Sequence, residues 1–251
     1  MSKVNILGYE ISAVGLEGDI AAARNIISSG KRGGYVACAN PHSLVESLKD
    51  RSFSLALRSA SILLPDGVGI VLASRILGQE IPGRVAGAEF FLAFNEMANR
   101  SGGLKYFFLG STPRVLAGIE ERLASEYPAI RVCGRESPPF KDELSDAENS
   151  IIVDKINKAA PDVLWVGMTA PKQEKWIYKN RERLDVPLIG AIGAVFDFYS
   201  GEKMRAPEWV RNIGLEWLPR LAREPKRLWR RNFVSSPLFL CLVIRQRLVG
   251  R

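Results

Sequence analysis

Short apolar runs alternate with helix-length segments along most of this chain, and that alternation limits the fold more than any other feature. Six runs have the length and the aliphatic or aromatic content of buried strands: residues 35–39, 61–64, 105–109, 130–133, 162–168 and 186–192. Strands that alternate with helices are typical of βαβ units. The sequence therefore predicts an α/β protein with a largely parallel sheet and flanking helices.

The segment 144–159 illustrates how the helices are recognised. Its apolar residues fall at positions 144, 147, 151, 152, 156 and 159, which is the spacing of one buried helical face. No internal repeat or low-complexity tract divides the chain, and single α/β domains often reach about 200 residues. We expect one α/β domain over residues 1–202, followed by an appendage over residues 203–251.

Positive charge is concentrated in this appendage. Residues 203–251 contain 12 Lys and Arg against 3 Asp and Glu, whereas residues 1–202 contain 23 against 24. The appendage also holds Trp209, Trp217 and Trp229 among several leucines. Cations interleaved with Trp and Leu suit the surface of an anionic membrane, where apolar side chains insert and cations meet lipid phosphates.

Two other interpretations of the appendage stay open. A helical subdomain could pack its Trp and Leu on the body and leave the arginines solvated. A basic patch is also an electrostatic footprint for nucleic-acid phosphates, although the aliphatic run 237–244 argues against that partner. Residues 233–244 are far short of the roughly 20 that cross a bilayer, so this run can lie in a membrane interface but cannot span it.

The remaining composition excludes several classes. Glu10, Glu17 and Asp19 interrupt the start of the chain where a secretory signal needs an apolar stretch, so a cytosolic protein is expected. Three scattered cysteines suit neither a disulfide framework nor a zinc site, and a serine-type triad on His42, the only histidine, lacks a nucleophile motif. Neither a glycine-rich dinucleotide fingerprint nor an Asp-x-Asp pair is present. We therefore expect no cofactor and no metal ion.

Ligands of an open parallel sheet bind at the carboxyl ends of its strands, so residues just after the expected strands are candidates for a site. Asn40, before Pro41, can either cap a helix or hold a ligand. Asp66 lies in a Pro-Asp-Gly turn, which presents a carboxylate but is also ordinary turn chemistry. Gly110 opens a Ser-Thr-Pro helix start, which offers N–H groups to a phosphate or simply makes a turn.

The most specific string follows the fifth expected strand. Residues 167–176 read Gly-Met-Thr-Ala-Pro-Lys-Gln-Glu-Lys-Trp, and residues 190–198 read Gly-Ala-Ile-Gly-Ala-Val-Phe-Asp-Phe. Further motifs are Pro-Asp-Gly at 65–67, Arg-Val-x-Gly at 84–87, Phe-Leu-Gly at 108–110, Arg-Ala-Pro at 205–207, Gly-Leu-Glu-Trp at 214–217 and Glu-Pro-x-Arg at 224–227. On these ordered motifs, residues 35–231 resemble the bacterial WecG/TagA/CpsF glycosyltransferases (glycosyltransferase family 26).

The resemblance implies a Rossmann-like catalytic domain that moves a sugar from a UDP-sugar onto a saccharide carried on a polyprenyl diphosphate, such as undecaprenyl diphosphate. Such enzymes act in cell-surface polysaccharide, exopolysaccharide or teichoic acid synthesis. The enzyme would be a peripheral protein on the inner face of the bacterial plasma membrane. The appendage would engage that membrane and complete the active site.

The resemblance also assigns roles to residues of this chain. Asp66 corresponds to the proposed general base, and Asn40, Arg84 and Gln173 correspond to pocket positions. Arg220, Arg223, Arg227 and Arg230 form the cluster that approaches the lipid diphosphate. Gly110, Lys172, Glu174 and Asp197 complete our set of candidate substrate contacts; the aromatic neighbours of Asp197 favour a structural role, and Trp176 is expected to pack.

Three departures from the family pattern bear on the donor. Cys38 stands where the family commonly has threonine, and Ala86 and Glu89 stand in a segment that often has Thr and Asp. The donor sugar therefore stays open among N-acetylmannosamine, its uronic acid, glucose and glucuronic acid. The acceptor, the linkage and the oligomeric state, a homo-oligomer included, are also open.

The expected chemistry is a single displacement that inverts the anomeric carbon. A carboxylate such as Asp66 takes the proton of the acceptor hydroxyl, and Arg84, a helix N-terminus or an appendage arginine stabilises the departing UDP without a metal. A nucleic-acid-binding protein and a non-catalytic membrane scaffold are the alternatives. Release of UDP from a UDP-sugar distinguishes the enzyme from both.

Overall fold

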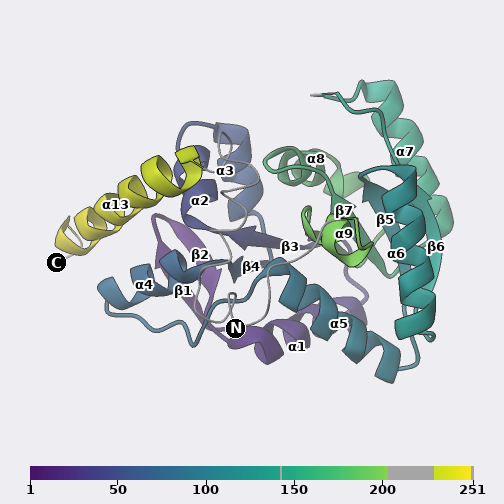
Figure 1. The fold of residues 1–251 in the computed structure, drawn as a ribbon, viewed down its shortest axis with the longest axis horizontal. Helices are drawn as coiled ribbons and strands as arrows, with labels where there is room; N and C mark the ends of the chain where they lie inside the picture. Colours follow the sequence, from purple (N-terminus) through teal and green to yellow (C-terminus); the bar gives the residue numbers. More distant parts are fainter. Residues whose placement is uncertain (142, 203–228, 250–251) are drawn as a thin grey trace.

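The computed structural model describes residues 1–141, 143–202 and 229–249, and it shows one six-stranded sheet with helices on both faces (Figure 1). The strands of this sheet, in chain order, are β3 (Gly34–Ala39), β4 (Ile62–Pro65), β5 (Lys105–Gly110), β6 (Arg131–Glu136), β7 (Val163–Gly167) and β8 (Leu188–Ala191). Their spatial order is β4-β3-β8-β7-β5-β6, and every neighbouring pair is parallel. The predicted α/β class is confirmed, and each predicted strand overlaps one of these six.

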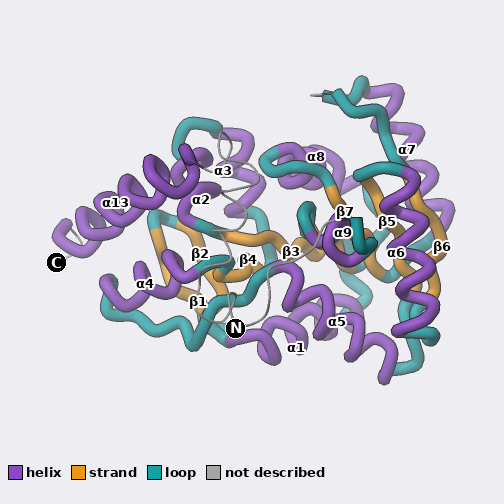
Figure 2. Tube along the Cα trace, in the orientation of Figure 1, coloured by secondary structure: helices purple, strands orange, loops and turns teal. Residues whose placement is uncertain are grey.

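Helices surround the strands of the sheet (Figure 2). Two hydrophobic clusters divide these helices between the two faces. One face is covered by α2 (Pro41–Ser47), α3 (Arg51–Arg58), α4 (Val68–Ile76), α7 (Asp146–Ala159) and α8 (Lys172–Asn180), the last followed by the short 3₁₀ helix η1 (Arg181–Arg183). The other is covered by α1 (Gly15–Ser28), α5 (Gly87–Arg100), α6 (Pro113–Glu126) and α9 (Val195–Tyr199). Helix α7 confirms the helix predicted over 144–159.

Alternation along the strands produces the two clusters. In β3, Tyr35 and Ala37 face the first cluster, while Val36 faces the second, as a period of two residues requires. The second face centres on the fully buried Trp165, whose ring meets Phe91 edge-on at 5.2 Å between centroids. Burial on both faces makes the strands continuously apolar, which is why the sequence shows them clearly.

An amino-terminal hairpin was not among the predicted strands. β1 (Lys3–Ile6) pairs antiparallel with β2 (Tyr9–Ser12) across a turn in which Leu7 and Gly8 both have positive φ, 53° and 80°. Both strands are only four residues long, and polar side chains interrupt their apolar pattern. Short alternating runs of this kind carry a weak signal compared with the strands of the central sheet.

The carboxyl-terminal helix α13 (Ser236–Val249) packs on the same layer as α2 and α4, after the π-helical turn η2 (Arg230–Ser235) (Figure 1). Phe239 and Val243 of α13 are fully buried. Gln246 accepts a hydrogen bond from the backbone N–H of Leu7 at 2.8 Å and donates to the carbonyl of Asn5 at 3.0 Å. This part of the basic appendage thus packs on the body. Among the described helices, none is long and apolar enough to span a membrane.

Candidate active site at the carboxyl edge of the sheet

The Asp66 turn lies where β4 ends and α4 begins. Gly67 has φ of +101°, a conformation that favours glycine, and it caps α4 directly. The backbone N–H of Asp66 donates to the carbonyl of Ala39, the last residue of β3, at 2.8 Å. The half-buried Asp66 is therefore fixed beside the end of the neighbouring strand. The turn expected from the sequence is confirmed.

Asn40 caps α2 at the adjacent strand end. Its Oδ1 accepts the backbone N–H of Ser43 at 3.0 Å, and its own N–H donates to Ser43 Oγ at 2.9 Å. The capping role considered for this residue is therefore present. Capping uses only the oxygen of the side-chain amide and leaves its NH₂ group outside this pair of hydrogen bonds. A residue that caps a helix here can also face a ligand at the edge.

The loop that carries Arg84 is attached to the end of β4, beside the Asp66 turn. The N–H of Val85 donates to the carbonyl of Pro65 at 2.9 Å, which ties this loop to the end of β4. The Arg84 guanidinium lies 3.0 Å from Glu89 Oε1, and Glu89 Oε2 accepts the backbone N–H of Ala86 at 3.2 Å. Glu89 thus caps α5 and orients the arginine. The structure brings the loops of Asn40, Asp66 and Arg84 together.

Gln173 and Glu174 lie on the first turn of α8, after β7. Both are buried, with 5% and 3% exposure. Gln173 Nε2 donates to Glu174 Oε1 at 2.9 Å, and Gln173 Oε1 accepts the backbone N–H of Gly193 at 3.1 Å. Gly193 follows β8, which pairs with both β3 and β7. The amide of Gln173 therefore lies at the end of β8, between the end of β3, which Asn40 follows, and the end of β7.

Burial shifts the pKa values of two groups at this edge. Burial raises the pKa of Glu174 to about 7. At Cys38, on β3, burial raises the thiol pKa well above its usual value, and the charges of Asp66 and Glu174 raise it further. Cys38 therefore carries a neutral thiol near two carboxyl groups, and it is no nucleophile at neutral pH.

The remaining predicted residues lie farther along the edge. Gly110 ends β5, two strands beyond β8, and Thr112 caps α6 by accepting the N–H of Val115 at 3.3 Å. Lys172 turns toward the loop after β6, where its amino group hydrogen-bonds the carbonyl of Lys141 and lies 5.7 Å from the centre of the fully exposed Phe140 ring. The structure does not place either beside Asp66.

Asp197 and Trp176 occupy opposite faces of the sheet. Asp197 is half-buried on α9. Trp176 is buried, and its indole Nε1 donates to Asn149 Oδ1 on α7 at 2.7 Å, which confirms the packing role predicted for it. Of the predicted arginines, Arg220, Arg223 and Arg227 lie outside the described residues, together with Trp209 and Trp217, and Arg230 begins η2.

Two contributors to the edge were not assigned from the sequence. Gly193 holds Gln173, and Glu89 orients Arg84. The sequence does contain a signal for Gly193, which directly follows the strand predicted over 186–192. A glycine at such a position often marks a place where another group approaches the backbone closely. A β-carbon on Gly193 would lie 2.7 Å from Gln173 Oε1 and 2.8 Å from the carbonyl oxygen of Met168. The pairing of Glu89 with Arg84 has no comparable signal.

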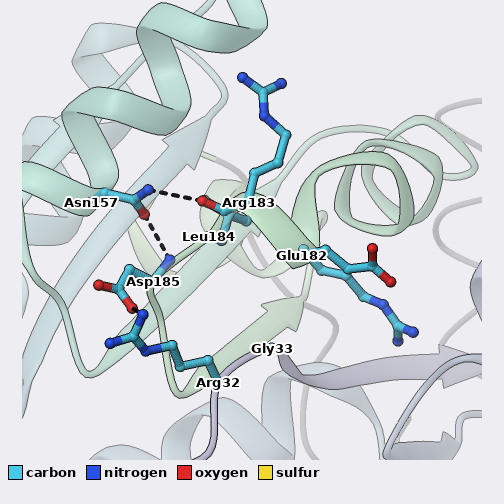
Figure 3. Close-up of a pocket in the computed structure, with 8 residues that line it drawn as sticks. Arg32, Gly33, Asn157, Glu182, Arg183, Leu184 and Asp185 are labelled. Atoms are coloured by element: carbon cyan, nitrogen blue, oxygen red, sulfur yellow. Dashed lines mark hydrogen bonds and ion pairs between the residues drawn. The ribbon is translucent and has the colours of Figure 1, made fainter.

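An open cavity of about 540 Å³ lies at the opposite, amino edge of the sheet (Figure 3). Asn157 bridges two backbone groups there, donating to the carbonyl of Arg183 at 2.9 Å and accepting the N–H of Asp185 at 2.7 Å. Arg32 pairs with Asp185, and the Arg183 side chain extends away from them (Figure 3). None of the predicted site residues lines this cavity.

Over the described part of the chain, no three His, Cys, Asp or Glu side chains gather as a metal site requires.

The fold is an α/β fold with a parallel sheet, in which ligands generally bind beyond the carboxyl ends of the strands. Residues 4–251 match the family model described as glycosyl transferase WecG/TagA/CpsF family. The chain belongs to this family and is a glycosyltransferase.

Curated relatives support the same placement. A protein of Bacillus spizizenii is 31% identical over 214 residues, 85% of this chain and 80% of the relative. One of Bacillus subtilis is 31% identical over 216 residues, 86% and 81% of the two chains. One of Staphylococcus aureus is 26% identical over 240 residues, 95% and 91%. Each is named N-acetylglucosaminyldiphosphoundecaprenol N-acetyl-beta-D-mannosaminyltransferase.

Proposed function

We propose that this enzyme transfers a hexose from a UDP-sugar onto a saccharide carried on polyprenyl diphosphate, in the synthesis of a cell-surface polysaccharide or teichoic acid. Membership of the family supports the reaction class, and the names of the relatives support a lipid-diphosphate acceptor. The observation that carries the proposal is the pair of backbone hydrogen bonds from Asp66 to Ala39 and from Val85 to Pro65. They bring a carboxylate, an amide and a guanidinium to one edge.

Asp66 is the general base in this proposal. The acceptor hydroxyl has a pKa far above 7, so it must lose its proton as it attacks the anomeric carbon of the donor. Asp66 is half-buried on a rigid turn, and its neighbours Ala39 and Gly67 fix the turn from both sides. A carboxylate carried on a turn whose backbone is held in this way is the group that accepts the proton. One displacement of this kind inverts the configuration at the anomeric carbon.

Arg84 and Gln173 act on the donor. Charge develops on the UDP oxygen as the glycosidic bond breaks, and an oriented guanidinium stabilises it. Glu89 holds Arg84 in place for this role. Gly110 and the start of α6 are the candidate contacts for the donor phosphates, and Lys172 and Asp197 extend the binding surface. In this mechanism cationic side chains take the place of a divalent ion.

The basic appendage, residues 203–251, brings the enzyme to the membrane. Arg220, Arg223, Arg227 and Arg230 meet the diphosphate of the acceptor. Trp209, Trp217 and Trp229, with the leucines between them, insert at headgroup level, whereas α13 packs on the body. Each cation near an anionic surface contributes about 1 kcal/mol. In this proposal, residues 1–202 form the catalytic domain. The protein is a peripheral enzyme on the inner face of the plasma membrane.

Release of UDP tests the proposal directly. Purified enzyme is given a short-chain lipid-diphosphate N-acetylglucosamine acceptor and, in turn, the UDP-activated forms of N-acetylmannosamine, N-acetylmannosaminuronic acid, glucose and glucuronic acid. Acceptor-dependent release of UDP with one of them, unchanged in excess EDTA, is expected. Release that EDTA abolishes and Mg²⁺ restores would overturn the metal-free mechanism. No release with any donor, together with salt-sensitive duplex binding, would favour a nucleic-acid-binding protein.

The appendage is tested separately with the triple variant R220A/R223A/R227A, which keeps every Trp and Leu. If the arginines act in the active site, turnover on the soluble acceptor falls at any salt concentration. If they act only as an anchor, turnover is kept and binding to anionic liposomes is lost, with partial recovery at low salt because exposed charges are screened within about 8 to 10 Å. Liposome binding unchanged by this variant would contradict the electrostatic anchor.

A further inference from the structure

The amide of Gln173 is fixed at both ends in one orientation. The N–H of Gly193 requires an acceptor, so it faces the amide oxygen at 3.1 Å. The carboxylate of Glu174 accepts at Oε1 from the NH₂ group at 2.9 Å. Reversal of the amide would set two donors against each other at Gly193 and two acceptors against each other at Glu174. Only one of the two NH₂ hydrogens is used in this arrangement.

Glu174 has few polar partners besides Gln173. The residue is 3% exposed, and it forms no ion pair among the described residues. Its second oxygen, Oε2, has no hydrogen-bond partner in the described part of the chain, and neither has the hydroxyl of the fully buried Tyr35 on β3. Tyr35 lies close enough that the charge on Glu174 adds to the effect of burial in raising its pKa. Buried polar atoms without partners cost stability and call for an explanation.

We propose that Glu174 is a positioning residue, which acts on the reaction only by orienting the Gln173 amide toward the donor. The inference rests on the proposed function, in which Gln173 contacts the donor. It replaces the direct substrate contact expected of Glu174 from the sequence. The free NH₂ hydrogen of Gln173 is the group that this arrangement delivers to the ligand.

Two properties of the edge favour this role over a merely structural one. Gly193 leaves no room for a side chain, because a β-carbon would lie 2.7 Å from the Gln173 oxygen. Glycine at position 193 therefore allows the Gln173 amide to approach the backbone closely, although glycine contributes no side chain to the packing there. A residue needed only for packing at the position of Glu174 would be apolar, since a buried carboxyl with one unpartnered oxygen destabilises the fold.

Four variants test the inference: E174Q, E174L, Q173A and the double variant Q173A/E174L, with E121Q and E121L on the exposed surface of α6 as matched controls. Gln at position 174 keeps an acceptor for the Gln173 amide, whereas Leu removes it. We expect E174L to lower kcat about 10- to 100-fold, the effect of a misplaced contact, and E174Q to retain most of the turnover that E174L loses. Thermal unfolding of each variant verifies that it is folded.

The double variant separates positioning from other roles. If Glu174 acts through Gln173, E174L causes no further loss in the Q173A background. Loss in E174Q as large as in E174L, or full additivity in the double variant, would overturn the inference. So would wild-type turnover in Q173A or in E174L. Wild-type enzyme that releases no UDP from any donor would overturn the proposed function, and the inference with it, which distinguishes the two failures.

Discussion

The two edges of the sheet use polar residues in opposite ways. At the carboxyl edge, Gln173 and Glu174 are almost wholly buried, and two directed hydrogen bonds hold the Gln173 amide. At the amino edge, Arg32 and Asp185 form an ion pair whose side chains are 68% and 44% exposed, beside the open cavity. Desolvated groups interact strongly, and solvated ones are screened. The proposed site thus consists of desolvated, oriented groups, whereas the residues that line the cavity are largely solvated.

The largest expected effect is at the carboxyl edge. Asp66→Asn keeps the size of the side chain and removes the base, so kcat should fall by about two to four orders of magnitude. The fold should survive, because the turn is held by backbone groups of Asp66 and Gly67. Turnover and thermal unfolding are measured together. Near wild-type turnover in Asp66→Asn would indicate that Asp197 or Glu89 is the base instead.

Gly193→Ala tests the close approach behind the site. Its β-carbon would meet Gln173 Oε1 at 2.7 Å and the Met168 carbonyl at 2.8 Å. The crowding should cost about 1 to 3 kcal/mol of unfolding free energy, and turnover should fall about tenfold because the amide moves. Gly83→Ala, whose added methyl meets nothing within 4 Å, is the stability control. Equal stability and turnover in both variants would contradict the role given to Gly193.

The buried carboxyl of Glu174 should make stability depend on pH. Its pKa is about 7 in the folded protein against a usual 4.5, so the unfolded chain releases the proton at lower pH. The contribution of Glu174 to the free energy of unfolding is fully present below about pH 4.5 and is lost as the pH rises through 7. Glu174→Gln should therefore raise the unfolding temperature at pH 8, with a free-energy gain of up to about 3 kcal/mol, and leave it nearly unchanged at pH 4.

Asp19 provides the matched control for this comparison. Burial raises its pKa to about 6, and its Oδ1 accepts from Ser12 Oγ at 2.5 Å. Asp19 lies on α1, which carries none of the candidate site residues. Asp19→Asn should give the same direction of pH-dependent stabilisation without changing turnover. A change in turnover as large as that of Glu174→Leu would mean that any buried carboxyl affects the reaction through stability alone.

The smallest effect is expected at the amino edge. Arg32→Ala removes one partner of an exposed ion pair, which is worth about 0.5 kcal/mol or less. UDP release should stay at the wild-type rate, because the site residues lie at the other ends of the strands. Denaturant unfolding and the turnover assay measure both quantities. A marked loss of turnover would indicate that the cavity has a role in the reaction and would contradict the difference inferred between the two edges.

The sequence predicts the central sheet well, because strands buried on both faces are long, apolar and separated by helices. It also predicts the turn at Asp66 and the cap at Asn40, since both depend on local residue types: Pro-Asp-Gly, and Asn before Pro. These features are encoded within a few consecutive residues. Local chemistry of this kind can be read without knowledge of the fold.

Contacts between distant segments could not be predicted in the same way. The partners Gln173 and Gly193 lie 20 positions apart, and Gln246 lies more than 230 positions from Asn5 and Leu7. Such pairs depend on how strands are ordered in space, which no periodicity reveals. The hairpin over residues 3–12 was missed for a related reason: its short strands are stabilised by packing against the body and by α13.

The attachment of α13 has a consequence for the order in which the fold is completed. A ribosome makes the hairpin, α2 and α4 long before residues 236–249 emerge, and domains generally fold from the amino end during synthesis. Until then, the apolar surface that receives Phe239 and Val243 stays exposed, and the hairpin tip lacks its bonds to Gln246. Chains still in synthesis therefore expose an apolar surface on α2 and α4, and chaperones are expected to bind there.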